Sequence, residues 1–424
     1  MALLIFAIPL TVNAEEIIKK GETLNLERCI DIALKLQPTI AAAASNVRVN
    51  ESRVGQAKSN YYPQLNSLSS YDRISPASSG RIVSVGGTSE TFNSYSSVFS
   101  LNQLIYDFGK TSAQVRIQNL NLDSSRSNLR NTNDQIILAV KQAYYGVVQA
   151  KYNVLVAEDT VKQTQQHLEQ AKGFYEVGTK PKFDVTKAEV DLSTAKLNLI
   201  RNENAFRVSI VNLNNVMGIP DAPEYSLDEN MPFAKYEITL EEATANAYRN
   251  RPDLQAIVAQ RQAAEKSIEL ARTGYYPVLT GNASYGWSGE KTSSLDRAWD
   301  VGAALSFPLF SGYLTKYQVE EAKANLNILK ADEESLRQTI FLEVQESYLT
   351  LRAAEDAIPT AKLGIEQAQE NLEIANGRYA AGVGNPIEVT DAEVGLANAR
   401  TSYIQALYAD KVAQASLEKA MGMR

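Results

Sequence analysis

Few residues in the sequence have the types and spacing that catalysis or metal binding would need. Cys29 is the only cysteine and His167 the only histidine, so neither can belong to a cluster of Cys or His metal ligands. The chain contains no phosphate-binding glycine loop and no nucleophile elbow. We therefore expect a protein that is not an enzyme and has no cofactor, in which Cys29 is a small packing residue of a helix and His167 is a solvated helix residue.

The other side chains able to do chemistry are carboxylates close to two glycines. Gly178 and Gly382 have the pattern of turn glycines with a positive φ. Asp184 and Glu388 follow these turns, each in the first turn of an expected helix, where a carboxylate can cap free amides and interact favourably with the helix dipole. Capping accounts for both residues. It does not account for Asp391, which lies further into the second of these helices.

Long helices must position the two turns. From Ala143 to Tyr175, mostly small or apolar residues recur at alternating spacings of four and three. This is the seven-residue repeat of helices packed along a seam. The same spacing returns between Ser347 and Tyr379. Pro359 interrupts the second of these segments and is expected to kink or split its helix. The sequence predicts helices, antiparallel across each turn, over 110–177 with 183–217 and over 315–380 with 387–421.

The helices belong to an internal duplication. The segment "AKSNYYPQLNSLSSY" (57–71) aligns with "ARTGYYPVLTGNASY" (271–285), a separation of 271 − 57 = 214 residues. Further on, "FYEVGTKPKFDVTKAEV" (174–190) aligns with "RYAAGVGNPIEVTDAEV" (378–394), a separation of 378 − 174 = 204. The difference indicates a deletion in the second copy, opposite the Ser/Gly-rich loop that follows Tyr71. We expect repeats over 15–218 and 240–424, joined by a linker over 219–239.

Between the helices of each repeat, the hydrophobic period changes from helical to two residues. In "WDVGAALSFPL" (299–309), apolar residues alternate with small or polar ones, which is typical of a half-buried strand. Aromatic residues near the strand ends favour a membrane interface, although a soluble sandwich with one wet face remains the alternative. Strands are expected over about 63–75, 92–106, 277–288 and 298–309. The expected membrane-strand and interface residues are Tyr61, Tyr62, Tyr275, Tyr276, Trp287, Trp299 and Phe307.

Four membrane strands in one chain would require other copies of the chain. Four strands cannot close a barrel, and an open sheet edge in lipid leaves backbone groups without hydrogen bonds. Three chains would supply twelve strands, an even number within the known range of such barrels.

Composition and the first residues indicate an exported protein that does not bind nucleic acid. The 424-residue chain has a net charge of −7 and a pI of about 5.2, whereas nucleic-acid binding needs a basic surface. Residues 1–14 combine an apolar run with small residues before Glu15, as in a cleaved signal peptide, but without its basic n-region. A buried N-terminal strand is the alternative for this segment.

These features together resemble the TolC family of outer-membrane efflux proteins over nearly all of the mature chain. The resemblance rests on the duplicated helix, strand, strand, helix, helix order, on the strand starts "YYPQL" and "YYPVL", and on two "Y-x-x-G-x-x-x-x-x-[DE]-V" turns. It implies a mostly α fold with β-strands, in which a homotrimer forms a twelve-stranded barrel in the outer membrane and a long α-helical barrel across the periplasm.

The implied function is a passive duct for efflux or type I secretion. Such a channel works with a periplasmic adaptor and an inner-membrane transporter of the RND, ABC or MFS type, and its helical tip rearranges to open. The cargo depends on the transporter, so drugs, metabolites, metals and secreted proteins all remain open. A coiled-coil scaffold in the periplasm or at the cell surface, with soluble strands, is the alternative function.

The resemblance also implies roles for residues at the tip. Asp184 and Tyr379 match positions that hold the tip shut, and Glu388 and Asp391 match two acidic rings at the constriction. Three copies of a carboxylate around a narrow axis would attract cations and repel anions.

One position departs from the family pattern. Gly384 stands where the family can have an arginine that pairs with the acid at Asp184, so Lys180 or Lys182 is expected to supply the cation. The turns through which the tip would meet an adaptor contain Tyr175, Gly178 and Gly382.

Overall fold

The computed structural model describes residues 18–75 and 91–423. The expected signal peptide and most of the Ser/Gly-rich loop lie outside these residues. The chain divides into two compact units. A helical unit comprises residues 18–44, 127–255 and 335–423, and a sheet unit comprises residues 45–126 and 256–334 within the described ranges. The helices α3 (Lys110–Glu176) and α7 (Leu314–Ala380) contribute residues to both units.

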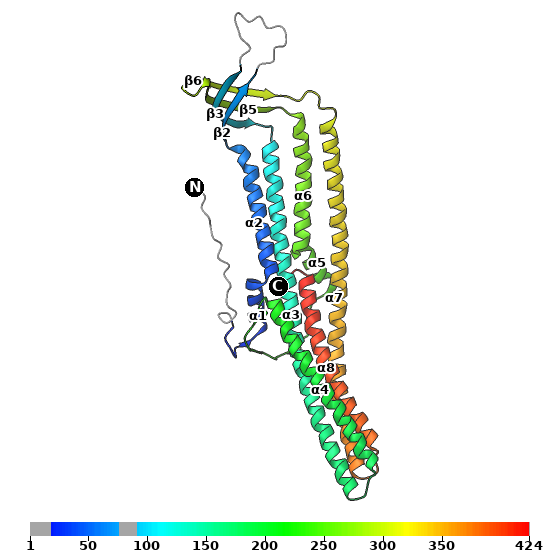
Figure 1. The fold of residues 1–424 in the computed structure, drawn as a ribbon. Helices are drawn as coiled ribbons and strands as arrows, with labels where there is room; N and C mark the ends of the chain where they lie inside the picture. Colours follow the sequence, from blue (N-terminus) through cyan, green and yellow to red (C-terminus); the bar gives the residue numbers. More distant parts are fainter. Residues whose placement is uncertain (1–17, 76–90, 424) are drawn as a thin grey trace, which may run out of the picture. The chain divides into compact units, whose positions relative to one another are not determined.

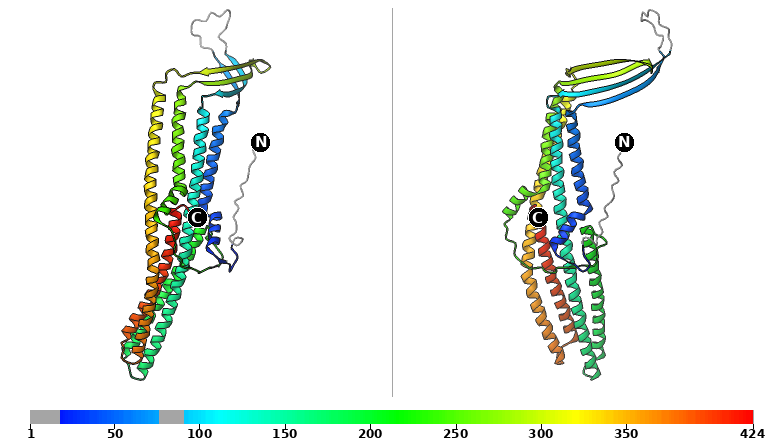
Figure 2. Two further views of the ribbon diagram at one scale, coloured as in Figure 1. Left: turned by 180° about the vertical axis from the view of Figure 1, so that it is seen from behind. Right: turned by 90° about the vertical axis from the view of Figure 1, so that its left-hand side faces the viewer.

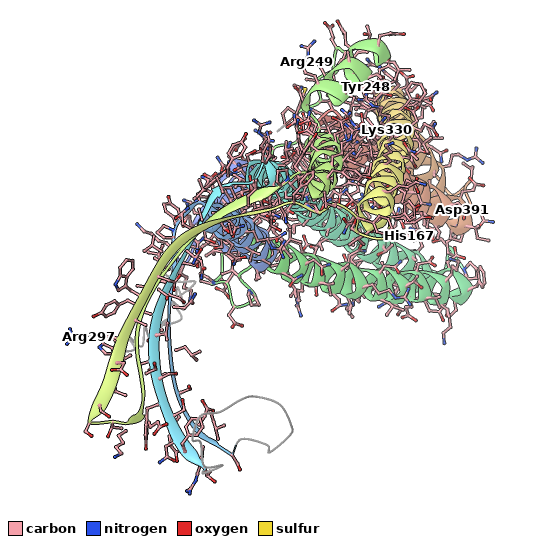
Figure 3. All side chains as sticks on the ribbon, turned by 90° about the horizontal axis from the view of Figure 1, so that it is seen from above. His167, Tyr248, Arg249, Arg297, Lys330 and Asp391 are labelled. Carbon is pink, nitrogen blue, oxygen red and sulfur yellow. The ribbon has the colours of Figure 1, made fainter. Side chains whose placement is uncertain are left out.

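The sheet unit contains one antiparallel sheet of four strands, which is curved along its strands (Figure 3). The strand order is β2-β3-β5-β6, so β2 and β6 form its edges. The strands are β2 (Gln64–Ile74), β3 (Phe92–Tyr106), β5 (Val278–Lys291) and β6 (Ser294–Ser306). A helix precedes each pair of strands: α2 (Pro38–Lys58) precedes β2 and β3, and α6 (Pro252–Arg272) precedes β5 and β6. The C-terminal part of each helix lies in this unit.

The register of the sheet separates two chemically different faces. Leu65, Leu101, Ala283 and Val301 are paired in one row across all four strands. The next row consists of Asn66, Ser100, Ser284 and Asp300, and it points to the opposite face because strand side chains alternate. The aromatic side chains Tyr71, Tyr95, Phe99, Tyr285, Trp287 and Trp299 share the face of the first row. Leu65, Val301 and Trp299 are each 70% exposed or more, so the described residues leave this part of the apolar face uncovered.

The last strand differs from its expected range of 298–309. Strand β6 begins at Ser294, directly after a two-residue turn, and ends at Ser306. Phe307 therefore lies beyond the strand, although it is exposed. Pro308 follows immediately and has no N–H to donate to a sheet, which explains the earlier end.

The helical unit contains four long helical segments that run side by side (Figures 1 and 2). They are the C-terminal parts of α3 and α7, together with α4 (Lys182–Met217) and α8 (Pro386–Ala420). Shorter elements accompany them: α1 (Leu26–Leu36), α5 (Leu240–Asn250), and the parallel strands β1 (Thr23–Leu24) and β4 (Ser226–Leu227). Helix α7 continues through Pro359, so of the two expected effects of this proline the split is wrong and the kink stays a prediction.

One apolar core of the helical unit lies between α1, α3 and the end of α4. Cys29, Val140, Leu213 and Met217 are all fully buried in it. Burial raises the pKa of the Cys29 thiol to about 12, and the thiol is therefore protonated and unreactive at neutral pH. The expectation that Cys29 is a packing residue is confirmed.

The two halves of the chain contain matching elements. Helices α1 and α5 both have 11 residues, α2 and α6 both have 21, and α3 and α7 both have 67. The strand starts also match, because short 3-10 helices at Ser59–Tyr61 and Thr273–Tyr275 precede β2 and β5. Among residues 18–75 and 91–423, no helix is both long and apolar enough to cross a membrane.

Candidate functional site

The two turns of the helical unit have the same backbone geometry. Gly178 and Gly382 have φ angles of 76° and 75°, as expected for turn glycines. The N–H of Gly178 donates to the Tyr175 carbonyl at 3.0 Å, and that of Gly382 donates to the Tyr379 carbonyl at 3.1 Å. Each turn therefore closes one helix and reverses the chain into the next, which places the end of α3, the start of α4, the end of α7 and the start of α8 at the same end of the unit (Figure 1).

Tyr379 lies at the centre of the contact between these four helix ends. Its side chain is fully buried, and its hydroxyl donates to Oδ2 of Asp184 at 3.3 Å. Its ring centroid lies 5.1 Å from that of His167 and 5.7 Å from that of Phe174. Nζ of Lys180 lies 5.0 Å from the same ring centroid, within the range of a cation–π interaction. The structure thus brings together Asp184, Tyr379 and Lys180.

The electrostatics of this contact keep Tyr379 a hydrogen-bond donor. Asp184 is only 4% exposed. Burial, the Asp184 charge and the hydrogen bond to it together raise the pKa of Tyr379 to about 12, so the hydroxyl retains its proton at physiological pH. Asp184 accepts this bond instead of capping α4, whose N-cap residue is Pro181 and has no side-chain capping bond. Glu388 is not a cap either, because Asn385 caps α8.

Gly384 has a steric reason to be glycine. A Cβ atom at this position would lie 2.7 Å from the Tyr379 nitrogen and 2.8 Å from the Arg378 carbonyl carbon, so an arginine cannot occupy this turn without a backbone shift. Nζ of Lys180 donates to the Gly384 carbonyl at 3.4 Å. The lysine therefore binds the second turn and the Tyr379 ring. We expected it to pair with the Asp184 carboxylate, and within the chain it does not. Lys182 is exposed.

The two other acids of the predicted gate are exposed. Glu388 accepts a hydrogen bond from Nε of Arg378 at 3.2 Å. Asp391 lies at the periphery of the helices (Figure 3), and its carboxylate forms no hydrogen bond or ion pair with another residue in the described ranges. Tyr175 is 46% exposed. Within one chain, these three residues are not part of the Tyr379 contact.

Two buried groups beside this contact were not predicted from the sequence. His167 is 5% exposed and its Nδ1 has no partner within the described parts of the chain, so its interpretation as a solvated residue is wrong. Glu393 is also 5% exposed, and burial raises its pKa to about 7. The only available signal for His167 was its position next to the seam residue Leu168, which does not define which neighbouring helix the side chain faces.

The predicted interface aromatics lie in the sheet unit, away from these residues in sequence. Tyr61, Tyr62, Tyr275 and Tyr276 are between 48% and 66% exposed and lie at the C-terminal ends of the two short 3-10 helices. Trp287 packs edge-on against Tyr285 on the apolar face of the sheet, with ring centroids 5.0 Å apart. The four tyrosines are exposed and Trp287 is half-buried.

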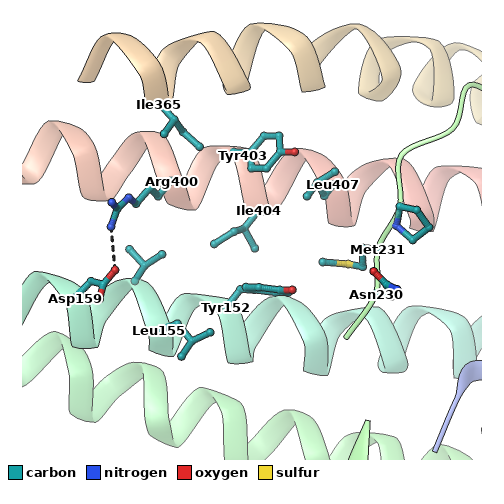
Figure 4. A pocket seen from close by; sticks show the side chains of 12 residues that line it. Tyr152, Leu155, Asp159, Asn230, Met231, Ile365, Arg400, Tyr403, Ile404 and Leu407 are labelled. Atoms are coloured by element: carbon teal, nitrogen blue, oxygen red, sulfur yellow. Dashed lines mark hydrogen bonds and ion pairs between the residues drawn. The ribbon is translucent and has the colours of Figure 1, made fainter. Parts of the chain in front are cut away.

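A groove of about 440 Å³ lies between α3 and α8 in the helical unit (Figure 4). Leu155, Ile404 and Leu407 contribute to its largely apolar lining. Its one ion pair joins Nη1 of Arg400 to Oδ2 of Asp159 at 3.1 Å. Because this arginine is already paired, we assign no ligand to the groove.

Comparison with known families decides the class of protein. The outer membrane efflux protein family matches residues 29–219 and 244–423, which is most of the chain. The chain belongs to the outer membrane efflux protein family. Members of this family are outer-membrane efflux channels with a periplasmic extension and no enzymatic activity.

Individual relatives agree with this assignment. Outer membrane protein TolC of Escherichia coli K12 is 24% identical over 422 residues, which cover 94% of this chain and 82% of TolC. Protein CyaE of Bordetella pertussis is 24% identical over 395 residues, which cover 92% of this chain and 81% of CyaE.

Solved structures share the fold. A membrane protein from Pseudomonas aeruginosa superposes with a TM-score of 0.84 at 21% identity, covering 95% of this chain and 91% of the other. The outer membrane protein VceC of Vibrio cholerae superposes with a TM-score of 0.83 at 19% identity, covering 94% of this chain and 96% of VceC.

Proposed function

We propose that three copies of this efflux protein form one channel, which serves as the exit duct of a tripartite efflux or type I secretion assembly. The observation that carries the proposal is the four-stranded sheet, with one apolar face, one polar face and two edges. Among the described strands, β2 and β6 each pair on one side only. In lipid such edges must be paired, and twelve strands from three copies would close the sheet with its apolar face outward.

The exposed faces of two long helices support the homotrimer independently. Helix α4 carries apolar side chains at a seven-residue spacing on the side away from its buried seam, and α7 carries a comparable row. In the helical unit, the exposed apolar residues of α4 are Phe183, Val190, Leu197, Ile200, Val208 and Val211, and those of α7 include Leu342, Leu349, Leu363 and Ile374. A second seam of this kind is typical of helices that pack against another chain, so α4 of one copy is proposed to pack against α7 of the next.

The tip is the proposed gate and docking surface. The bond between Tyr379 and Asp184 would hold the α7–α8 hairpin against α4. Three copies of the exposed carboxylates of Glu388 and Asp391 would line the constriction and favour cations. Val177 and Val383, beside the two turn glycines, are 72% and 71% exposed, which suits docking by a periplasmic adaptor that links the channel to an inner-membrane transporter. Relatives are described as antibiotic and toluene efflux pump proteins, and the cargo of this chain depends on its transporter.

A pair of arginine substitutions on neighbouring residues of β6 tests the channel. Ala303 pairs with Gly281 on the apolar face, and Ala304 pairs with Thr280 on the polar face. Ala303→Arg would place a charge in lipid, at a cost of about 2–4 kcal/mol near the bilayer centre, and should reduce assembly in the outer membrane. Ala304→Arg is the matched control, because its side chain would face the water-filled interior.

The measurement is the amount of folded protein in purified outer membranes, with total expression as the reference. Equal assembly of the two variants would contradict a lipid-facing sheet. An Ala303→Arg variant that folds and stays soluble without detergent would favour the alternative function, a soluble coiled-coil scaffold.

A further inference from the structure

The contact between the two helical hairpins differs in chemistry from the interior of each hairpin. Helices α3 and α4 share an apolar seam that includes Leu168 and Leu192, and α7 and α8 share another that includes Leu372 and Leu396. Between the hairpins, polar interactions accompany the ring contacts of Tyr379. Thr390 of α8 donates from Oγ1 to Oδ2 of Asp191 on α4 at 2.9 Å. Each hairpin is thus held together by packing, whereas polar groups contribute much of the contact between the two hairpins.

Glu393 lies one helical turn beyond Thr390, on the same side of α8. Its side chain is 5% exposed, and its carboxyl group forms no hydrogen bond or ion pair with another residue of the described chain. The charged groups that face it are Asp191 and Lys187, both on α4. Nζ of Lys187 is already bound to the two carboxylate oxygens of Asp191, at 2.5 and 2.7 Å. An ionised Glu393 would therefore place a second carboxylate beside a lysine that is already paired with the partly buried Asp191.

The first repeat shows that the burial of this carboxyl group does not follow from helix periodicity alone. Glu189 occupies the equivalent position (393 − 204 = 189) on α4. It is exposed, and its carboxylate lies 4.0 Å from Nζ of Lys172. The two repeats thus place the same residue type in opposite environments, and only Glu393 lies within the contact between hairpins.

We propose that Glu393 is a proton-operated latch of the channel tip, which holds α8 against α4 when protonated and separates the two hairpins when ionised. The latch regulates the gate of the proposed channel and so rests on that proposed function. It requires no ligand, because the proton alone changes the charge of the contact.

The direction of the pH effect follows from the environment of the carboxyl group. In the closed tip, burial and the neighbouring Asp191 raise the pKa of Glu393 from 4.5 to about 7. In an open tip the solvated group has its ordinary pKa. The closed tip therefore keeps its full stability below pH 4.5 and loses it progressively as the pH rises to about 7. The largest change in the ratio of closed to open tips is about 300-fold.

His167 acts in the opposite direction. Burial lowers its pKa from 6.5, and the groups that face it are Asp184, Asp191 and Lys187 on α4 and Tyr379 on α7. The neutral imidazole thus stabilises the closed tip, and acidification below pH 6.5 weakens it. In the native protein the two effects oppose each other between pH 4.5 and 6.5. Replacing His167 by Asn, the residue at the equivalent position 371 of the second repeat, isolates the effect of Glu393.

The experiment measures the conductance of the full-length channel in planar bilayers, with the pH varied from 5 to 8 on the side of the tip only. In the His167→Asn background we expect conductance to rise as the pH increases from 5 to 7. Adding Glu393→Gln, which has nearly the same shape and no charge, should leave conductance low at every pH. Adding Glu189→Gln instead is the matched control and should preserve the rise.

Four results would overturn the latch. A rise that persists in the His167→Asn, Glu393→Gln variant would show that another group titrates. A rise abolished equally by Glu189→Gln would show that only the total charge of the tip matters. A His167→Asn channel that conducts equally at all pH values would contradict the latch while leaving the channel function intact, whereas inserted protein that never conducts would overturn both proposals.

Discussion

Replacing Tyr379 by Phe should loosen the channel tip without disturbing its packing. The substitution removes only the hydroxyl that donates to Asp184 at 3.3 Å, and it keeps the ring contacts to His167 and Phe174. Hydrogen bonds to charged groups contribute about 1.5–3 kcal/mol, and the long distance favours the lower half of that range. Asp184 is 4% exposed and would lose a partner in a buried site. We therefore expect a loss of about 1.5–2 kcal/mol, or roughly a 10- to 30-fold increase in local opening.

Hydrogen–deuterium exchange of the purified channel measures this opening. Peptides from the start of α4 and the end of α7 should exchange faster in the Tyr379→Phe variant, whereas peptides from the sheet should be unchanged. Tyr175→Phe is the matched control, because Tyr175 has the equivalent position in the first repeat and is 46% exposed. If the Tyr379→Phe variant exchanges at the wild-type rate, or if Tyr175→Phe accelerates exchange equally, the role assigned to this hydrogen bond is refuted.

Two further predictions concern the tip. Gly384→Ala should destabilise the second turn by about 1–3 kcal/mol through overpacking, because the new Cβ would lie 2.7 Å from the Tyr379 nitrogen. Limited proteolysis should then cleave this turn faster. Gly364→Ala is the control and should have no such effect, because its Cβ would meet nothing within 4 Å. Asp391→Asn should reduce the cation preference of the channel severalfold by removing an exposed charge from each copy; an unchanged reversal potential in bilayer recordings would make Asp391 an ordinary helix residue.

Much of the secondary structure could be predicted because it depends on periodicity along one segment. The seam that includes Leu168, Val185 and Leu192 is buried as the seven-residue spacing indicates. The duplicated strand starts at Tyr61 and Tyr275 also have matching local structure. The start of β6 was harder to predict from the sequence, because its two-residue turn at 292–293 contains no glycine, proline or asparagine to mark it.

The buried polar groups of the tip could not be predicted in the same way. His167 and Glu393 lie beside the seam positions and face a helix of the other hairpin. A single sequence defines the spacing along one helix, but not which of two neighbouring helices a flanking residue meets. For the same reason, the internal similarity at Glu189 and Glu393 gives no indication that one carboxyl group is exposed and the other buried.

We expect this efflux protein to close its sheet, and so to become a channel, only as an assembly of three chains. Native mass spectrometry of the protein extracted from outer membranes in mild detergent tests this claim most directly. We expect a complex of three chains that resists dissociation, because both edges of the four-stranded sheet and the apolar rows on α4 and α7 would be covered by neighbouring copies. A folded protein recovered predominantly as single chains or pairs would contradict the account.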